Sequence, residues 1–171
     1  WDLKIISMAY IFTVIFMSKL VSNMFCISCH YKSTVPCLLC LSNFFHSFNE
    51  EKKIFRDAQE TCEKAALNGF KTGRLVEPKT KSFNDKVYAE TNIVFGQRKN
   101  TWIGIREKGG SWVYTSSGTE IVFENWSSRI GSKIGPELCA FLMSRSNPVG
   151  QWSPRFCNIK RYELPFICEF V

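Results

Sequence analysis

Eight cysteines in a chain of 171 residues constrain its fold more than any other feature. Four of them lie in CISCHYKSTVPCLLC, residues 26–40, and this stretch fits three different chemistries. It opens with C-x-x-C-H, the attachment pattern of a c-type haem. Its spacing, C-x2-C-x7-C-x2-C, hints at a zinc site. In an oxidising compartment the same cysteines would form disulfides, and so many cysteines in a short chain favour that compartment.

The N-terminal residues support a secretory route. Lys4 is followed by an uncharged, mostly apolar run over residues 5–17. This run is shorter than the roughly 20 residues that a membrane-spanning helix needs, but it suits the apolar region of a signal peptide. We therefore predict a signal peptide over residues 1–22. The alternative is an uncleaved membrane anchor, if the run extends through residues 20–25.

Secretion favours disulfides in the Cys-rich segment, residues 23–40. A haem needs an apolar pocket and usually a second axial ligand, and this segment precedes any packed domain. Both Cys26–Cys37 and Cys29–Cys40 would enclose ten residues. The spacing does not choose among the possible pairings.

Two helices are predicted in the remainder, residues 41–171. Apolar residues recur at helical spacing in the first, and we expect Gly69 to end it. Its predicted apolar face carries Ile54, Phe55, Ala58, Cys62, Ala65 and Ala66. Ser82 and Asp85 have the spacing of a capping box at the start of the second helix. The apolar face of that helix would carry Phe83, Val87 and Tyr88.

Strands and one long loop make up the rest. Residues 101–105 and 111–116 flank Gly109-Gly110, which predicts a hairpin. Further strands are expected at residues 44–48, 74–76, 139–144, 151–153 and 165–170. Residues 127–138 are rich in Ser and Gly and are predicted to form a long irregular loop. Helices followed by strands in one domain indicate an α+β fold.

Four cysteines belong to this domain. If they nest as Cys62–Cys168 and Cys139–Cys157, they close one long and one short loop. In the chain-entropy model such loops contribute about 4.7 and roughly 3 kcal/mol of stability. The outer disulfide would hold the two ends of the domain together.

Several short motifs follow one another in a characteristic order. They are the Phe55-x-x-Ala58-x-x-x-Cys62 helix, GRLVEPK at 73–79, WIGI at 102–105, FENW at 123–126, Glu137-x-Cys139, Trp152-x4-Cys157 and the final FICEF. In this order and spacing, residues 41–171 resemble the C-type lectin domain. The resemblance implies a compact, disulfide-stapled α+β fold with two helices, small antiparallel sheets and a long binding loop. Many members carry a further N-terminal disulfide of C-x10-C spacing, which Cys29 and Cys40 have.

The resemblance also implies where calcium would bind. In sugar-binding members a Glu-Pro-Asn or Gln-Pro-Asp tripeptide, a Glu two residues before the third cysteine and a Trp-Asn-Asp triplet provide oxygen ligands, and Ca²⁺ takes six to eight of these. Here the tripeptide falls at residues 130–132, Ile-Gly-Ser, and the triplet is Trp152-Ser153-Pro154. Only Glu137 keeps its position. We therefore expect the family's calcium site to be lost, with no metal or other cofactor.

Positive charge takes the place of these ligands. The chain has a formal net charge of +7. Between residues 127 and 161 the only acidic residue is Glu137, whereas the basic ones are Arg129, Lys133, Arg145, Arg155, Lys160 and Arg161. Arginines can contact sulfate, phosphate or carboxylate groups in a bidentate manner. The alternative is a solvated basic face with no ligand.

The predicted ligand-binding residues are Arg129, Lys133, Glu137, Trp152, Ser153 and Arg155. Trp126 and Trp152 could stack on a sugar, or they could belong to the core. Glu137 could instead pair with a neighbouring arginine. Asn125-Trp126-Ser127 also matches the N-glycosylation pattern, although the bulky tryptophan and expected burial disfavour modification at Asn125.

The predicted function is an extracellular, secreted carbohydrate-binding module that works without calcium and favours anionic ligands. The alternative is a C-type-lectin-like domain that binds a protein through the long loop, where Ile130 and Ile134 offer apolar surface. An enzyme is not expected, because no nucleophile–base pair occurs and both histidines, His30 and His46, fall outside the expected domain core. Nucleic acid is not an expected partner of a secreted, disulfide-bonded chain. A membrane would be a partner only through an uncleaved anchor.

Overall fold

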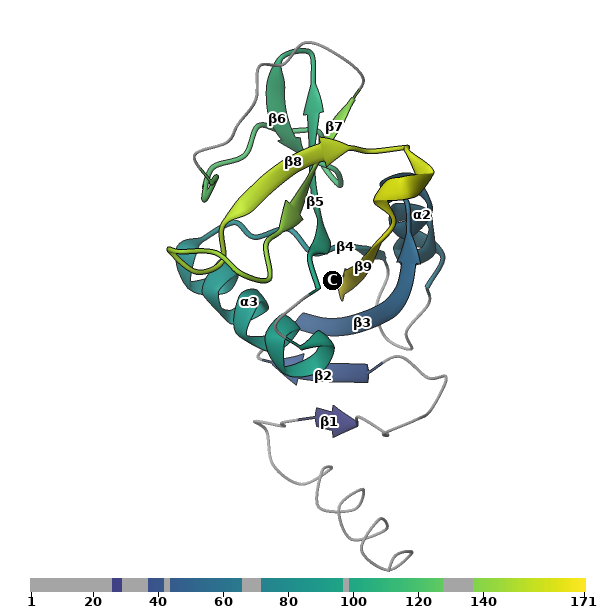
Figure 1. Ribbon diagram of the computed structural model, residues 1–171. Coiled ribbons are helices and arrows are strands. Elements are labelled where there is room, and N and C mark those ends of the chain that lie inside the picture. The colour runs from purple at the N-terminus through teal and green to yellow at the C-terminus, as the bar shows by residue number, and fades with distance from the viewer. Residues whose placement is uncertain (1–25, 29–36, 42–43, 66–71, 97–98, 128–136) are drawn as a thin grey trace, which may run out of the picture.

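The computed structural model describes residues 26–28, 37–41, 44–65, 72–96, 99–127 and 137–171. Seven strands follow one another in a sheet of order β1-β2-β3-β9-β5-β7-β8, and β4 pairs with β9 while β6 pairs with β5 (Figure 1). The strand bounds are Cys26–Ser28 (β1), Cys37–Leu41 (β2), Phe44–Lys53 (β3), Gly73–Leu75 (β4), Thr101–Lys108 (β5), Ser111–Tyr114 (β6), Leu138–Leu142 (β7), Trp152–Phe156 (β8) and Leu164–Phe170 (β9). The predicted strands and the predicted hairpin between β5 and β6 are confirmed.

The central strands carry apolar side chains on both faces. Successive residues of a strand point to opposite faces. Here they enter two core clusters, one on each face of the sheet: the first contains Ile103 and Ile167, and the second contains Trp102, Phe166 and Cys168. In β9, Ile167 packs in the first cluster whereas Phe166 and Cys168 pack in the second. Ile103 and Trp102 divide in the same way in β5. The sheet is therefore buried on both sides, which explains why these strands read as continuous apolar runs.

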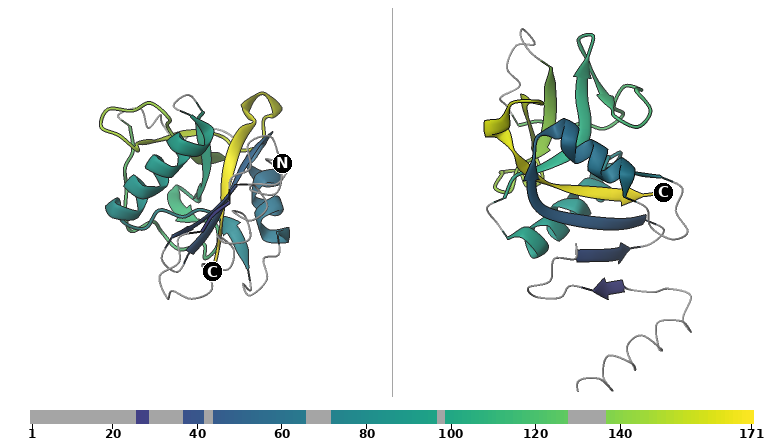
Figure 2. Two further views of the ribbon diagram at one scale, coloured as in Figure 1. Left: turned by 90° about the horizontal axis from the view of Figure 1, so that it is seen from below. Right: turned by 90° about the vertical axis from the view of Figure 1, so that its right-hand side faces the viewer.

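One helix covers each of these faces, as the view from below shows (Figure 2). Helix α2, Phe55–Lys64, buries Phe55, Ala58 and Cys62 as its spacing predicts. It ends at Lys64, so the expectation that Gly69 ends it is wrong; Ala65 already has extended backbone angles. Gly69 itself lies outside the described residues.

Helix α3, Lys81–Phe95, begins with a different cap from the predicted Ser82–Asp85 box. Its N-cap is Thr80, whose hydroxyl accepts a hydrogen bond from the backbone N–H of Phe83 at 3.2 Å. Threonine satisfies this otherwise unpaired helix N–H as serine would, so the cap lies two residues earlier than the sequence pattern indicated.

Both predicted disulfides of the domain are present. Cys62–Cys168 joins α2 to the last strand, and Cys139–Cys157 joins β7 to the residue after β8. The first spans 106 residues of sequence and the second 18, so they close one long and one short loop. The long link ties the two ends of the domain together, as expected.

The N-terminal Cys-rich segment contributes strands to the same sheet. Strand β2 pairs with β3, and β1 pairs with β2 in a register that sets Cys26 across from Cys40. These strands lie beyond β3, at the end of the sheet opposite the β5–β6 hairpin (Figure 1). Cys29 and the predicted leader, residues 1–22, lie outside the described residues. Among the helices that are described, none is long and apolar enough to cross a membrane.

A buried polar pair connects β3 to α3. His46 is 1% exposed, and its Nδ1 lies 3.0 Å from Oε2 of Glu90, which is also buried. The expectation that His46 lies outside the core is therefore wrong. His46 lies on β3 and its ring packs against that of Phe83 on α3. The carboxylate of Glu90, also on α3, contacts the imidazole nitrogen.

Candidate functional site

The residues predicted to bind a ligand are concentrated on the hairpin of β7 and β8. Glu137 stands just before β7, and its backbone C=O accepts a hydrogen bond from the N–H of Cys157. Ser153 lies across from Phe141, near the other end of the hairpin. Four residue steps along the strand, roughly 13 Å, separate these two places. The fold therefore does not bring Glu137 and Ser153 together at one small ligand.

Glu137 faces an arginine. Its carboxylate Oε1 lies 3.4 Å from Nη1 of Arg106 on β5, and both side chains are partly exposed. The sequence-based alternative, that Glu137 pairs with a neighbouring arginine, is confirmed. Arg106 is brought near Glu137 by the pairing of β5 with β7, which sets Arg106 across from Cys139.

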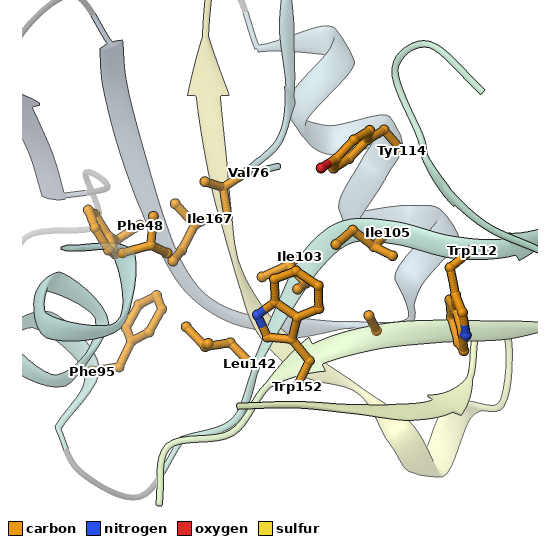
Figure 3. Packing of buried hydrophobic residues seen from close by; sticks show 12 residues of the cluster. Phe48, Val76, Phe95, Ile103, Ile105, Trp112, Tyr114, Leu142, Trp152 and Ile167 are labelled. Atoms are coloured by element: carbon orange, nitrogen blue, oxygen red, sulfur yellow. The ribbon is translucent and has the colours of Figure 1, made fainter. Parts of the chain in front are cut away.

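Trp152 is a core residue, and its assignment as a ligand contact is wrong because it is 0% exposed. Its indole lies among Ile103 and Leu142 (Figure 3). Nε1 donates a hydrogen bond of 2.7 Å to Oδ1 of Asn84, a residue of α3 that is also fully buried. The ring meets that of Trp126 edge-on, with 5.4 Å between centroids.

Trp152 also holds the segment that leads into the long loop. Its backbone N–H donates to the C=O of Asn125, and its C=O accepts from the N–H of Ser127. The side chain of Asn125 donates through Nδ2 to the C=O of Gly150 at 2.8 Å. The nitrogen that would carry a glycan is therefore engaged, so we expect Asn125 to remain unmodified.

Arg155 is stacked between two aromatic rings. Its guanidinium carbon lies 4.9 Å from the ring centroid of Phe141 on β7 and 4.9 Å from that of Tyr162. Tyr162 ends a short 3-10 helix, Lys160–Tyr162, and Arg161 of this helix lies 4.8 Å from the same ring. We call Arg155, Lys160, Arg161 and Tyr162 the Tyr162 cluster.

The cations of the Tyr162 cluster have no carboxylate within ion-pair distance in the described part of the chain. Lys160 and Arg161 are exposed, and Arg155 is half-buried. Arg155 and the other basic residues were predicted from the sequence, whereas Tyr162 was not. An aromatic residue directly after Lys-Arg is nevertheless a visible signal for cation–aromatic stacking.

Arg145 lies elsewhere, in the turn between β7 and β8. With Tyr88, Ser144, Ser146 and Asn147 it lines an open depression of about 470 Å³. The hydroxyl of Tyr88 donates to the C=O of Ser144, which fixes one wall. Arg129 and Lys133, the two predicted site residues of the long loop, lie outside the described residues.

Across the ranges that are described, no group of three or more His, Cys, Asp or Glu side chains is arranged to hold a metal ion. At the family's ligand positions the described residues are Glu137, Ser153 and Pro154, which offer one carboxylate between them. The remaining positions, residues 130–132, are outside the described part.

Comparison with known proteins agrees with this architecture. Residues 51–170 match the family described as Lectin C-type domain. Tetranectin from Homo sapiens and from Bos taurus is 32% identical over 127 residues, which cover 70% of this chain and 56% of each tetranectin. The chain thus spans little more than half the length of these relatives.

Solved structures show the same fold. The carbohydrate-recognition domain of mouse scavenger receptor C-type lectin superimposes with a TM-score of 0.61 at 25% identity, covering 77% of this chain and 91% of that one. Human lithostathine gives 0.64 at 23% identity, with 84% and 90% covered. The C-type lectin CEL-I from Cucumaria echinata gives 0.67 at 12% identity, with 82% and 99% covered. The match of residues 51–170 to the Lectin C-type domain shows that the chain belongs to this family, and the solved structures share its fold.

Proposed function

We propose that this chain is an extracellular ligand-binding module that recognises anionic carbohydrate without calcium. The two disulfides support an extracellular location, because disulfides form and persist in oxidising compartments. Binding rather than catalysis is supported by the burial of His46 against Glu90, which keeps this imidazole away from any substrate.

Calcium independence is supported by the surroundings of Glu137. A calcium ion needs six to eight oxygen ligands, most of them from carboxylates, amides and carbonyls. Ser153 and Pro154 stand where the family has an amide and a carboxylate, and the guanidinium of Arg106 lies beside the one retained carboxylate. A fixed positive charge at that distance opposes a second cation.

The observation that carries the preference for anions is the charge of the segment from Glu137 to Glu163. Its cations are Arg145, Arg155, Lys160 and Arg161, and its two ends carry the only carboxylates. Cations of this density, exposed except for the half-buried Arg155, attract anionic ligands over a distance set by the ionic strength.

A glycan array probed with the oxidatively folded full chain tests the proposal. The array is run with calcium, with a chelator and at increasing salt. We expect binding to sulfated, sialylated or phosphorylated glycans that persists in chelator and weakens as salt rises. Binding that the chelator abolishes would contradict the calcium-free site. Binding to neutral glycans alone would contradict the anionic preference.

A protein ligand is the second candidate, and one observation favours it. Val122 and Val149 are 80% and 54% exposed, unusual values for large apolar side chains. They lie in two segments that the Asn125–Gly150 hydrogen bond holds together. A contiguous patch of exposed apolar side chains marks a protein-binding surface, and these two valines would contribute to one. An array without any bound glycan would favour this alternative.

A further inference from the structure

The Tyr162 cluster has the features of a built anion site. Two guanidinium groups share one aromatic ring, since the carbons of Arg155 and Arg161 lie 4.9 and 4.8 Å from the centroid of Tyr162. A guanidinium carries five N–H donors around the edge of its plane, and contact with an aromatic ring does not use them as hydrogen bonds to a carboxylate would. Those edges match the oxygens of sulfate or carboxylate in a bidentate manner.

The cluster is also held in place before any ligand arrives. Arg155 lies on β8, and Phe141, the other ring that it contacts, lies on β7. The Cys139–Cys157 disulfide joins β7 to the residue after β8, and its cysteines lie two residues from Phe141 and Arg155 respectively. The backbone N–H of Tyr162 donates to the C=O of Ile159, which fixes the turn that carries the ring. Groups that are already ordered lose less conformational entropy when they bind.

Nothing in the described residues neutralises these charges. Arg106 and Arg74, by contrast, lie within ion-pair distance of Glu137 and Glu169 respectively. An arginine without a carboxylate partner keeps its donors for an external anion. Lys160 adds a third cation to the cluster, on the same short helix as Arg161.

We propose that the Tyr162 cluster is the binding surface for a linear sulfated polysaccharide. This inference rests on the proposed function and adds where on the domain the ligand binds and to which chemical class it belongs. Three cations, one on β8 and two on the short 3-10 helix, suit a polymer with repeated charges better than a single small anion. Stacked arginines suit sulfate groups, because the weakly hydrated guanidinium gives up little water when it meets a weakly hydrated anion.

Binding of a heparin-derived oligosaccharide to the full chain, followed by calorimetry, tests this proposal. Arg161→Ala is the main variant, because Arg161 is exposed and its removal leaves the core intact. We expect its affinity to fall about tenfold, the effect of losing one charge-assisted hydrogen-bonding group. The double variant Arg155→Lys/Arg161→Lys keeps the charge but loses the planar stacked geometry, and we expect a loss at least as large.

Arg145→Ala is the matched control. It removes the same charge from the same segment, but from the depression beside Tyr88 rather than from the cluster. We expect its affinity to change less than about twofold, as for a distant screened charge. Thermal unfolding of every variant confirms that it is folded.

Several outcomes would overturn the proposal. An equal loss in Arg145→Ala and Arg161→Ala would mean that only net charge matters. Equal binding of a desulfated oligosaccharide, or of a DNA duplex at the same charge density, would mean that sulfate is not selected. If wild type binds anionic glycans without calcium and Arg161→Ala binds them equally well, the Tyr162 cluster is not the binding surface, although the proposed function stands. If wild type binds no anionic glycan, both fail.

Discussion

Replacing Trp152 with phenylalanine separates a core role from a ligand-binding role at this position. The indole Nε1 donates to Oδ1 of Asn84 at 2.7 Å, and both residues are 0% exposed. Phenylalanine cannot donate, so Oδ1 loses this donor in a site away from water. A buried polar atom left without its partner costs about 1–3 kcal/mol.

The smaller ring adds a second cost. Complete truncation of a buried tryptophan to alanine costs about 3–5 kcal/mol, and phenylalanine retains most of the ring, so about 1 kcal/mol is expected from the remaining space. The total loss in the free energy of unfolding is then about 2–4 kcal/mol. For a domain of this size the midpoint of thermal unfolding should fall by roughly 6–12 °C.

Denaturant unfolding of the disulfide-intact protein measures this loss. Trp126→Phe is the matched control, since Trp126 is half-buried and meets the same ring at 5.4 Å; its loss should be about 1 kcal/mol. Asn84→Ala should cost less in the Trp152→Phe background than in wild type, with a coupling of about 1–2 kcal/mol. Glycan affinity per folded molecule should stay within twofold of wild type.

Either of two results would contradict this role of Trp152. A loss below about 1 kcal/mol without coupling to Asn84 would mean that the buried hydrogen bond contributes little. An unchanged stability together with a large loss of glycan affinity would restore Trp152 as a ligand contact.

Three further predictions concern stability. Glu77→Ala should lower the free energy of unfolding by about 3–5 kcal/mol in denaturant titrations, because its fully buried carboxylate lies within 4 Å of two cations and accepts three hydrogen bonds; a loss below 1 kcal/mol would contradict this role. The double variant Cys139→Ala/Cys157→Ala should lose about 3 kcal/mol by the same assay, as expected for the 18-residue separation, and an unchanged midpoint would refute the estimate. Burial raises the pKa of Glu169 above its ordinary value and outweighs the opposing attraction of Arg74. The stability contribution of this group is therefore complete below the unfolded-state pKa, at about pH 4, and is lost as the pH rises through the folded-state pKa. Unfolding at pH 4, 5.5 and 7 should show the stability of Glu169→Gln rising relative to wild type with pH, and a falling difference would contradict the sign.

The buried face of α2 was predictable because it depends on local spacing. Phe55, Ala58 and Cys62 recur at intervals that only one face of a helix can satisfy. The cap of α3 was less predictable, since Thr80 and Ser82 are both capping residues and the choice depends on where the chain leaves the preceding segment. Helix ends are generally the least certain feature of a periodic pattern.

The candidate site was predictable in part. The arginines of the β7–β8 region and the replacement of the family's calcium ligands can be read directly from residue types. The contacts that give each arginine its role join residues that are remote in sequence. Arg106 meets Glu137 across 31 residues, and it does so only because β5 pairs with β7.

The family, the order of the elements, the cysteines available for disulfides and the excess of positive charge all follow from the amino-acid sequence. These properties depend on residue identity and local spacing. Only the tertiary structure decided that His46 and Trp152 are buried, because burial is set by which elements pack against a residue. It likewise decided that Arg155 and Arg161 share the ring of Tyr162, since a 3-10 turn and a neighbouring strand must both be in place before two guanidinium groups can meet one aromatic face.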